Sequence, residues 1–264
     1  MHIFTLKRIL PLLLITILIS CNNQSSVKDP EQESAVEPAL SVSSRDDDKA
    51  DDIPEQANPD VVTIQGGEET TGEEKDDDKQ SRFLFNNGAR AYQNEDYEGG
   101  IEYFERLVAE DPENRKAFYN LGIGYFKLGK YHESLQSFNK AIAIMPRDSM
   151  SIQYRGRVYY MMGNYRQCLR DYEMVISMKP NDPIAYYNRG TAKGQLKDYA
   201  GALKDFDRAI ELDDQYAEAY FNRGLANFFL GRRHDACYDW RKAHSMGHYE
   251  SEKAIRNHCE GDNQ

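Results

Sequence analysis

The sequence lacks the residue patterns of known catalytic sites. Its 264 residues contain no phosphate-binding loop, no nucleophile elbow and no pair of ligand motifs at the spacing of a zinc site. The abundant Asp and Glu side chains fall on the exposed faces of the expected helices, where solvation accounts for them. We therefore expect no enzymatic activity, no cofactor, no metal ion and no small-molecule substrate.

The sequence also lacks an apolar run long enough to span a membrane. Its longest run, Ile9–Ser20, is broken by Pro11 and Thr16 and is shorter than the about 20 residues that a spanning helix needs. Lys7 and Arg8 precede this run, as in a secretory signal peptide. We therefore expect a cleaved targeting segment at the N-terminus.

This run ends in Leu18-Ile19-Ser20-Cys21, which resembles the lipobox of bacterial lipoproteins. The resemblance implies cleavage of a signal peptide over residues 1–20 and acylation of Cys21 by fatty acids such as palmitate, so that lipid anchors the chain to a membrane. An ordinary cleaved signal peptide with a chance cysteine is the alternative. Asn22 is not the Asp that retains enteric lipoproteins in the inner membrane, so the resemblance favours the outer membrane and leaves the leaflet open.

Residues 22–80 lack Tyr, Phe and Trp altogether. They hold 18 acidic and 5 basic residues, whereas residues 81–264 hold 26 of each. A segment this acidic and this poor in apolar residues cannot bury enough surface to fold. Together with the lipidated Cys21, it is predicted to form a disordered tether over residues 21–80. Binding of Ca²⁺ or of a basic partner is the alternative, but the Asp runs lack the spacing of a coordinating loop.

The rest of the chain repeats with a period of 34 residues. The marker of the period is a glycine that recurs at Gly88, Gly122, Gly156, Gly190 and Gly224. The period divides residues 81–250 into five units, which are 81–114, 115–148, 149–182, 183–216 and 217–250. A fixed period of this length is typical of a stack of identical supersecondary units.

Within each unit the residue pattern predicts two helices joined by a tight turn. A small residue is followed four positions later by an aromatic one, as in Gly100 and Phe104 or Ala236 and Trp240. A further apolar residue three positions on completes one helical face, because positions i, i+4 and i+7 lie together. Units one to three then end at a proline, which cannot continue a helix.

These units resemble the tetratricopeptide repeat, whose signature has Leu-Gly, Tyr, Ala, Phe, Ala and Pro at the corresponding positions. The resemblance covers residues 81–250 and implies an all-α, right-handed solenoid of five helix-turn-helix units, with a capping helix and tail over residues 251–264. Asp214 and His248 replace the closing proline, and Gly100 replaces a preferred alanine, so those two junctions depart from the family pattern.

In this family the first helix of each unit lines a concave groove that binds protein or peptide. By resemblance we expect the groove to be rich in aromatic and amide side chains, which suit burial of a peptide and hydrogen bonding to its backbone. Packing of the same side chains between helices is the alternative. The Lys and Arg residues that clamp a C-terminal carboxylate in chaperone-binding members are absent. The expected groove residues are Phe85, Tyr92, Tyr119, Asn120, Ile123, Phe126, Arg157, Tyr160, Tyr187, Asn188, Phe221, Asn222, Leu225 and Phe228.

Charged residues recur together in units three to five. An Arg precedes the constant Gly and an Asp precedes the aromatic, whereas units one and two lack both members. Joint presence and joint absence indicate that the two positions meet, and a planar guanidinium pairs well with a carboxylate. We therefore predict structural ion pairs between Arg155 and Asp171, Arg189 and Asp205, and Arg223 and Asp239.

Three cysteines follow Cys21. Cys168 occupies the small position of its helix and is expected to be buried. Cys237 faces the expected final helix, which ends at Cys259, so the two are candidates for a disulfide in an oxidising compartment, with two packed thiols as the alternative. Histidines crowd the same end, but Gly247 breaks the helical spacing between His244 and His248, so we expect no metal site.

The balanced charge of the repeats is unlike the basic surface of a nucleic-acid reader. We therefore expect a lipid-anchored protein of the bacterial cell envelope, with the outer membrane favoured, whose repeats bind another protein or peptide as a scaffold. Two alternatives stay open. One is a dedicated subunit of a machine that assembles outer-membrane proteins, secretins or pili; the other is a surface accessory to nutrient uptake.

Overall fold

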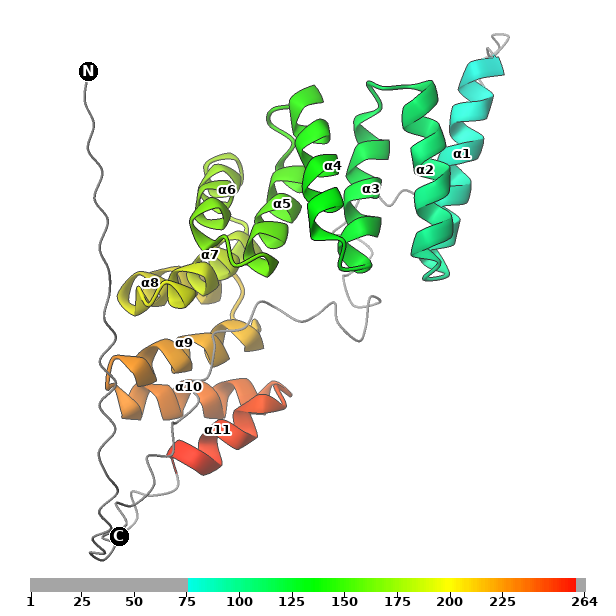
Figure 1. The fold of residues 1–264 in the computed structure, drawn as a ribbon. Coiled ribbons are helices and arrows are strands. Elements are labelled where there is room, and N and C mark those ends of the chain that lie inside the picture. The colour runs from blue at the N-terminus through cyan, green and yellow to red at the C-terminus, as the bar shows by residue number, and fades with distance from the viewer. Residues whose placement is uncertain (1–75, 260–264) are drawn as a thin grey trace, which may run out of the picture. The chain divides into compact units, whose positions relative to one another are not determined.

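The structure, a computed structural model, describes residues 76–259. The predicted signal peptide, Cys21 and nearly all of the acidic tether lie outside these residues. Within them the chain is entirely helical, and no helix is long and apolar enough to cross a membrane. The helices are α1 (Asp76–Gln93), α2 (Tyr97–Glu110), α3 (Arg115–Lys127), α4 (Tyr131–Ile144), α5 (Ser149–Met161), α6 (Tyr165–Met178), α7 (Pro183–Gln195), α8 (Tyr199–Leu212), α9 (Ala217–Phe229), α10 (Arg233–Ser245) and α11 (Glu250–His258) (Figure 1).

The helices stack in chain order, and each packs against the next. Odd-numbered helices from α1 to α9 are the first helices of the five units, and even-numbered ones from α2 to α10 are the second. The final helix, α11, packs against α10. This arrangement confirms the predicted all-α array of five helix-turn-helix units followed by a final helix.

The turn inside each unit depends on one residue in the left-handed region. Gly129, Gly163 and Gly231 have φ angles of 69°, 73° and 75°, and a glycine reaches these angles without steric cost. Units one and four place Glu95 and Lys197 at the same position, with φ angles of 60° and 62°. A side chain there costs about 1–2 kcal/mol, so the turn conformation is imposed by the packing of the two helices on either side.

The constant glycine of each unit lies directly against the constant aromatic residue of the same unit. A Cβ added to Gly122 would lie 2.6 Å from the ring of Phe138, and one added to Gly224 would lie 2.6 Å from the ring of Trp240. Both aromatic side chains are fully buried. The missing side chain therefore lets the two helices of a unit approach closely enough to bury a large ring between them.

A second small residue sets the contact between successive units. The third residue of each unit has no exposed surface in units two to five, where it is Ala117, Ser151, Ala185 and Ala219. In unit one, which the structure describes with no helix before it, the same position is Phe83 with 56% of its surface exposed. This position therefore marks the surface through which each unit packs on the one before.

Candidate functional site

The first helices of successive units contact one another directly, α3 with α5, α5 with α7 and α7 with α9. They therefore form one continuous face, which carries the residues predicted to line the groove. We call these fourteen residues the first-helix face. The structure divides them into a buried set and a partly exposed set.

Eight members of the first-helix face are buried. Tyr187 is completely buried, its ring lies against Phe206 and Tyr216, and its hydroxyl accepts a hydrogen bond from Asn222 Nδ2 at 2.8 Å. Such side chains hold neighbouring units together, which is the role that the packing alternative foresaw. The buried members are Tyr119, Asn120, Ile123, Tyr187, Asn188, Phe221, Asn222 and Leu225.

The other six members keep part of their surface exposed: Phe85, Tyr92, Phe126, Arg157, Tyr160 and Phe228. The guanidinium of Arg157 lies between two rings, 5.1 Å from the centre of Phe126 and 5.2 Å from that of Tyr154. Tyr160 Oη accepts a hydrogen bond from Gln195 Nε2 at 2.9 Å. Tyr154 and Gln195 therefore belong to this surface although the sequence prediction omitted them.

The partly exposed tyrosines are neutral at physiological pH, and burial strengthens their preference for the protonated form. Burial raises the pKa of Tyr92 and of Tyr160 well above the ordinary range of a phenol. Tyr92 Oη donates to the backbone oxygen of Asn120 at 3.0 Å, so it also ties unit one to unit two. The charge on this part of the face is therefore carried by Arg157, beside flat apolar rings.

The three predicted ion pairs are present as bidentate contacts. In each, Arg Nε and Nη2 reach the two oxygens of the Asp carboxylate, at 2.9 and 2.7 Å for Arg155 and Asp171. The distances are 2.9 and 2.6 Å for Arg189 and Asp205, and 3.0 and 2.6 Å for Arg223 and Asp239.

A third partner from the preceding unit was missed by the sequence prediction. Arg155 Nη1 donates to Asn139 Oδ1 at 2.8 Å, and Arg223 Nη1 donates to Asp207 Oδ1 at 2.8 Å. Both partners lie 16 residues before their Arg, just as each Asp lies 16 residues after it. One guanidinium thus connects the second helix of one unit with both helices of the next.

Burial raises the pKa of Asp171 and of Asp239, and the paired Arg side chain counteracts part of that rise. The side chains of both Asp residues are at most 5% exposed, whereas those of the Arg residues are 18% and 20% exposed. These arginines are therefore occupied within the array and are not free to bind an anion.

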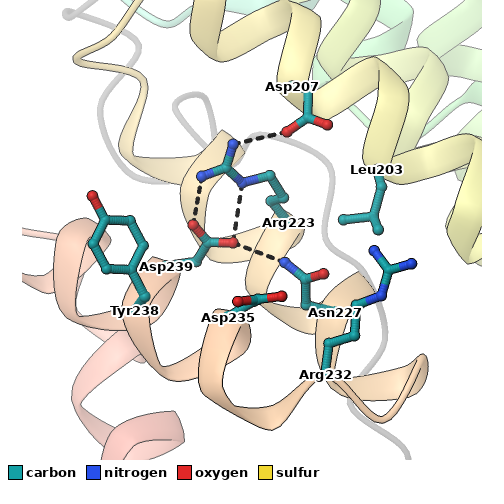
Figure 2. Close-up of a pocket in the computed structure, with 8 residues that line it drawn as sticks. All are labelled: Leu203, Asp207, Arg223, Asn227, Arg232, Asp235, Tyr238 and Asp239. Atoms are coloured by element: carbon teal, nitrogen blue, oxygen red, sulfur yellow. Dashed lines mark hydrogen bonds and ion pairs between the residues drawn. The ribbon is translucent and has the colours of Figure 1, made fainter.

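A pocket of about 250 Å³ lies beside the last of these pairs, between α8, α9 and α10 (Figure 2). Polar and charged side chains form most of its wall. Its lining residues are Leu203, Asp207, Arg223, Asn227, Arg232, Asp235, Tyr238 and Asp239.

The C-terminal end is held by a disulfide and by two histidine rings that pack on phenylalanines. Cys237 and Cys259 are bonded, with their Cα atoms 5.7 Å apart, and this bond joins α10 to the end of α11. His248 stacks on Phe221 at 4.3 Å between ring centres, and His258 lies 4.5 Å from Phe228. These rings are thus used for packing, and residues 76–259 contain no group of three side chains that could hold a metal ion.

Cys168 is the remaining cysteine of the described part. It is completely buried in α6, and burial raises the pKa of its thiol far above the ordinary value. A protonated, inaccessible thiol is a packing residue.

The sequence of two units matches the family model of the tetratricopeptide repeat, at residues 116–148 and 183–216. No curated protein matches the chain. Among solved structures, MamA 41-end from Desulfovibrio magneticus RS-1 is 20% identical with a TM-score of 0.61, and the match covers 65% of this chain and 97% of that one.

Two further structures are similar. YrrB, described as a tetratricopeptide-repeat protein with an unusual peptide-binding site, is 19% identical with a TM-score of 0.58, over 67% of this chain and 93% of that one. TTC0263, a thermophilic repeat protein in Thermus thermophilus, is 20% identical with a TM-score of 0.52, over 67% of this chain and 96% of that one. At these identities the likeness supports the fold.

Proposed function

We propose that this tetratricopeptide-repeat chain is a non-enzymatic protein of the bacterial envelope, anchored by lipid on Cys21, whose repeats bind another protein or peptide. The observation that carries the binding role is the partly exposed set of the first-helix face. Flat aromatic rings flank one guanidinium there, a combination of residue types from which binding hot spots are built. The peptide-binding site described for YrrB supports the same use of the fold.

The anchoring part of the proposal depends on Cys21 and on the acidic segment after it. Several acyl chains on one cysteine bind a membrane durably, because each buried CH₂ contributes about 0.8 kcal/mol. Palmitate labelling of cells that express the full chain tests this directly. The wild type should incorporate label and partition into detergent, and Cys21→Ser should do neither; a labelled Cys21→Ser protein would refute the anchor.

The binding part is tested by photocrosslinking from the first-helix face. The best positions are Phe126 and Tyr160, because Tyr187 and Phe221 are buried. A photoreactive residue at either should trap a partner in intact cells, and Arg157→Ala should reduce the yield. Met174, which is 41% exposed on the second helix α6, is the matched control. Equal crosslinking from Met174 would show that the first-helix face has no special role.

Recovery of complexes from solubilised envelopes and protease treatment of whole cells decide between a transient adaptor, a machine subunit and an uptake accessory. A stoichiometric complex recovered from solubilised envelopes would indicate a fixed subunit of an assembly machine. Protease treatment of whole cells that removes the repeats would place them at the surface, as nutrient uptake requires. Recovery of partners in small, variable amounts favours the adaptor.

A further inference from the structure

The pocket between α8, α9 and α10 differs from its counterpart one unit earlier. In unit four the ammonium of Lys193 lies 2.8 Å from Asp205 Oδ2, beside the guanidinium of Arg189. Two cations therefore share one buried carboxylate there. Asn227 stands 34 residues after Lys193 and occupies the same position in unit five.

Asn227 reproduces only one part of the lysine's role, the contact with the buried carboxylate. Its Nδ2 donates to Asp239 Oδ2 at 3.1 Å, which keeps one contact to the carboxylate. An asparagine side chain is shorter than a lysine side chain and carries no charge. The space beyond it is part of the pocket (Figure 2).

The amide of Asn227 also leaves an acceptor unused. The residue is only 6% exposed and lines the pocket, and its Oδ1 accepts no hydrogen bond from the residues that the structure describes. Because Asn227 lines the pocket, this oxygen is available to a hydrogen-bond donor that enters it.

The lining of the pocket holds three aspartates and two arginines. Arg223 is used fully, because it contacts Asp239 through Nε and Nη2 and Asp207 through Nη1. Asp235 adds a third carboxylate, one helical turn before Asp239, where unit four has Gly201. Like charges at this spacing repel each other. The other charged or titratable groups at this end of α10 are Arg232, which is exposed and lines the pocket, and His234, whose Nδ1 lies 3.6 Å from Asp235 Oδ1 and whose side chain is 98% exposed.

We propose that this pocket binds the ammonium or guanidinium group of a side chain on a partner protein. The cation takes the place that Lys193 fills in unit four, donates to Asn227 Oδ1 and Asp235, and lays its alkyl stem against Leu203. Such a site goes beyond the proposed first-helix face, because its lining comes from α8, the outer part of α9 and α10. It gives a bound protein a second, charge-selective contact.

The test is a titration of the ¹⁵N-labelled full chain, disulfide intact, followed by NMR. The probes are N-acetyl-arginine amide and N-acetyl-lysine amide, with N-acetyl-citrulline amide as the neutral isostere of arginine. The cationic probes should shift the side-chain amide of Asn227 and the backbone of Asp235, whereas citrulline should not. Larger shifts with arginine or with lysine identify which cation the site prefers. Equal shifts with citrulline, or none with any probe, would overturn the proposal.

Two variants secure the result. Asn227→Lys supplies the ammonium within the chain, as unit four does, and should abolish the shifts. Asp235→Asn changes an exposed side chain, so it leaves the fold intact, and should weaken binding by about tenfold through the loss of one charge-assisted contact. Unchanged binding in both variants would contradict the site. Since crosslinking from Phe126 does not involve this pocket, failure of one proposal leaves the other standing.

Discussion

The residue that recurs most strictly is the constant glycine, and its importance lies in the ring that it faces. Elsewhere in a helix, replacing glycine by alanine stabilises by up to about 1 kcal/mol. Here we predict the opposite sign. In Gly122→Ala the new methyl group would overlap the fully buried ring of Phe138, with a loss of about 1–3 kcal/mol in the free energy of unfolding. Chemical denaturation measures this loss.

The control for this prediction is Gln136→Ala. Gln136 is exposed on α4, the helix that carries Phe138, so this substitution should change the free energy of unfolding by less than about 0.5 kcal/mol. The double variant Gly122→Ala/Phe138→Leu should recover part of the loss, because a smaller side chain makes room for the methyl group. A Gly122→Ala protein more stable than the wild type would show that the close contact is not limiting.

The ion pairs are also a property of single residues, and the chain contains its own control. Arg155→Leu leaves Asp171 buried without its cation and should destabilise the protein by about 3 kcal/mol. Unit two carries Leu121 and Ser137 at these two positions. The double variant Arg155→Leu/Asp171→Ser should therefore cost less than the single variant, as thermal or urea unfolding would reveal. A larger loss in the double variant would argue that the pair itself is strongly stabilising.

For single residues, the sequence predicted which side chains pair with each other better than it predicted how exposed each side chain is. The Arg and Asp positions could be paired because both are present or both absent in each unit. The third partner could not, because its position holds Asn139 in one unit and Asp207 in another, and no single residue type marks it. The period places Tyr187 and Phe126 on the same face but does not say how deeply each is covered, which depends on the neighbouring unit.

Among the elements, α11 is held differently from the rest. Its main neighbour is α10, its contact with α9 is made by His258 on Phe228, and its buried residue is the small Ser251. The disulfide closes a loop between residues 22 positions apart, which corresponds to about 3 kcal/mol in the chain-entropy account. We therefore predict that reduction, or Cys237→Ser/Cys259→Ser, strips α11 of hydrogen-exchange protection while α3 to α8 keep theirs. Unchanged protection of α11 would mean that packing alone holds it.

The helix boundaries followed from local chemistry, with one exception. Prolines, turn residues and the small-to-aromatic spacing located α2 to α10 within the units. The first helix begins at Asp76, five residues before the predicted start of unit one. The composition of the acidic segment suggested that helix could not form there, but acidic residues are favourable in the first turn of a helix, so α1 extends into it.

The helical array over residues 76–259 is built from contacts between neighbouring helices and units. Stability is then approximately a sum of units and of junctions, and whole units can be removed in phase. Deletion of residues 149–182 joins Asp148 to Pro183. In the wild type, Asp182 precedes Pro183 and caps α7 by accepting hydrogen bonds from the amides of Ile184 and Ala185, so an Asp stays at the capping position after the deletion. We predict a folded, shorter array whose urea m-value falls by about one fifth, measured by circular dichroism.

The control for the deletion removes half of a unit. Loss of residues 149–164 would place α6 directly after α4, so that two second helices would meet and the alternation would fail. This variant should not fold cooperatively. If both deletions behaved alike, the contacts between units would not depend on which helix meets which.

Phe83 bears on how such a chain could lengthen over evolution. Repeat arrays grow by tandem duplication, which requires that any unit be able to follow any other. A copy of unit five inserted ahead of Ser81 would meet a phenyl ring where every internal junction offers a methyl or hydroxymethyl group. Duplication at this end is therefore hindered until position 83 mutates to a small residue.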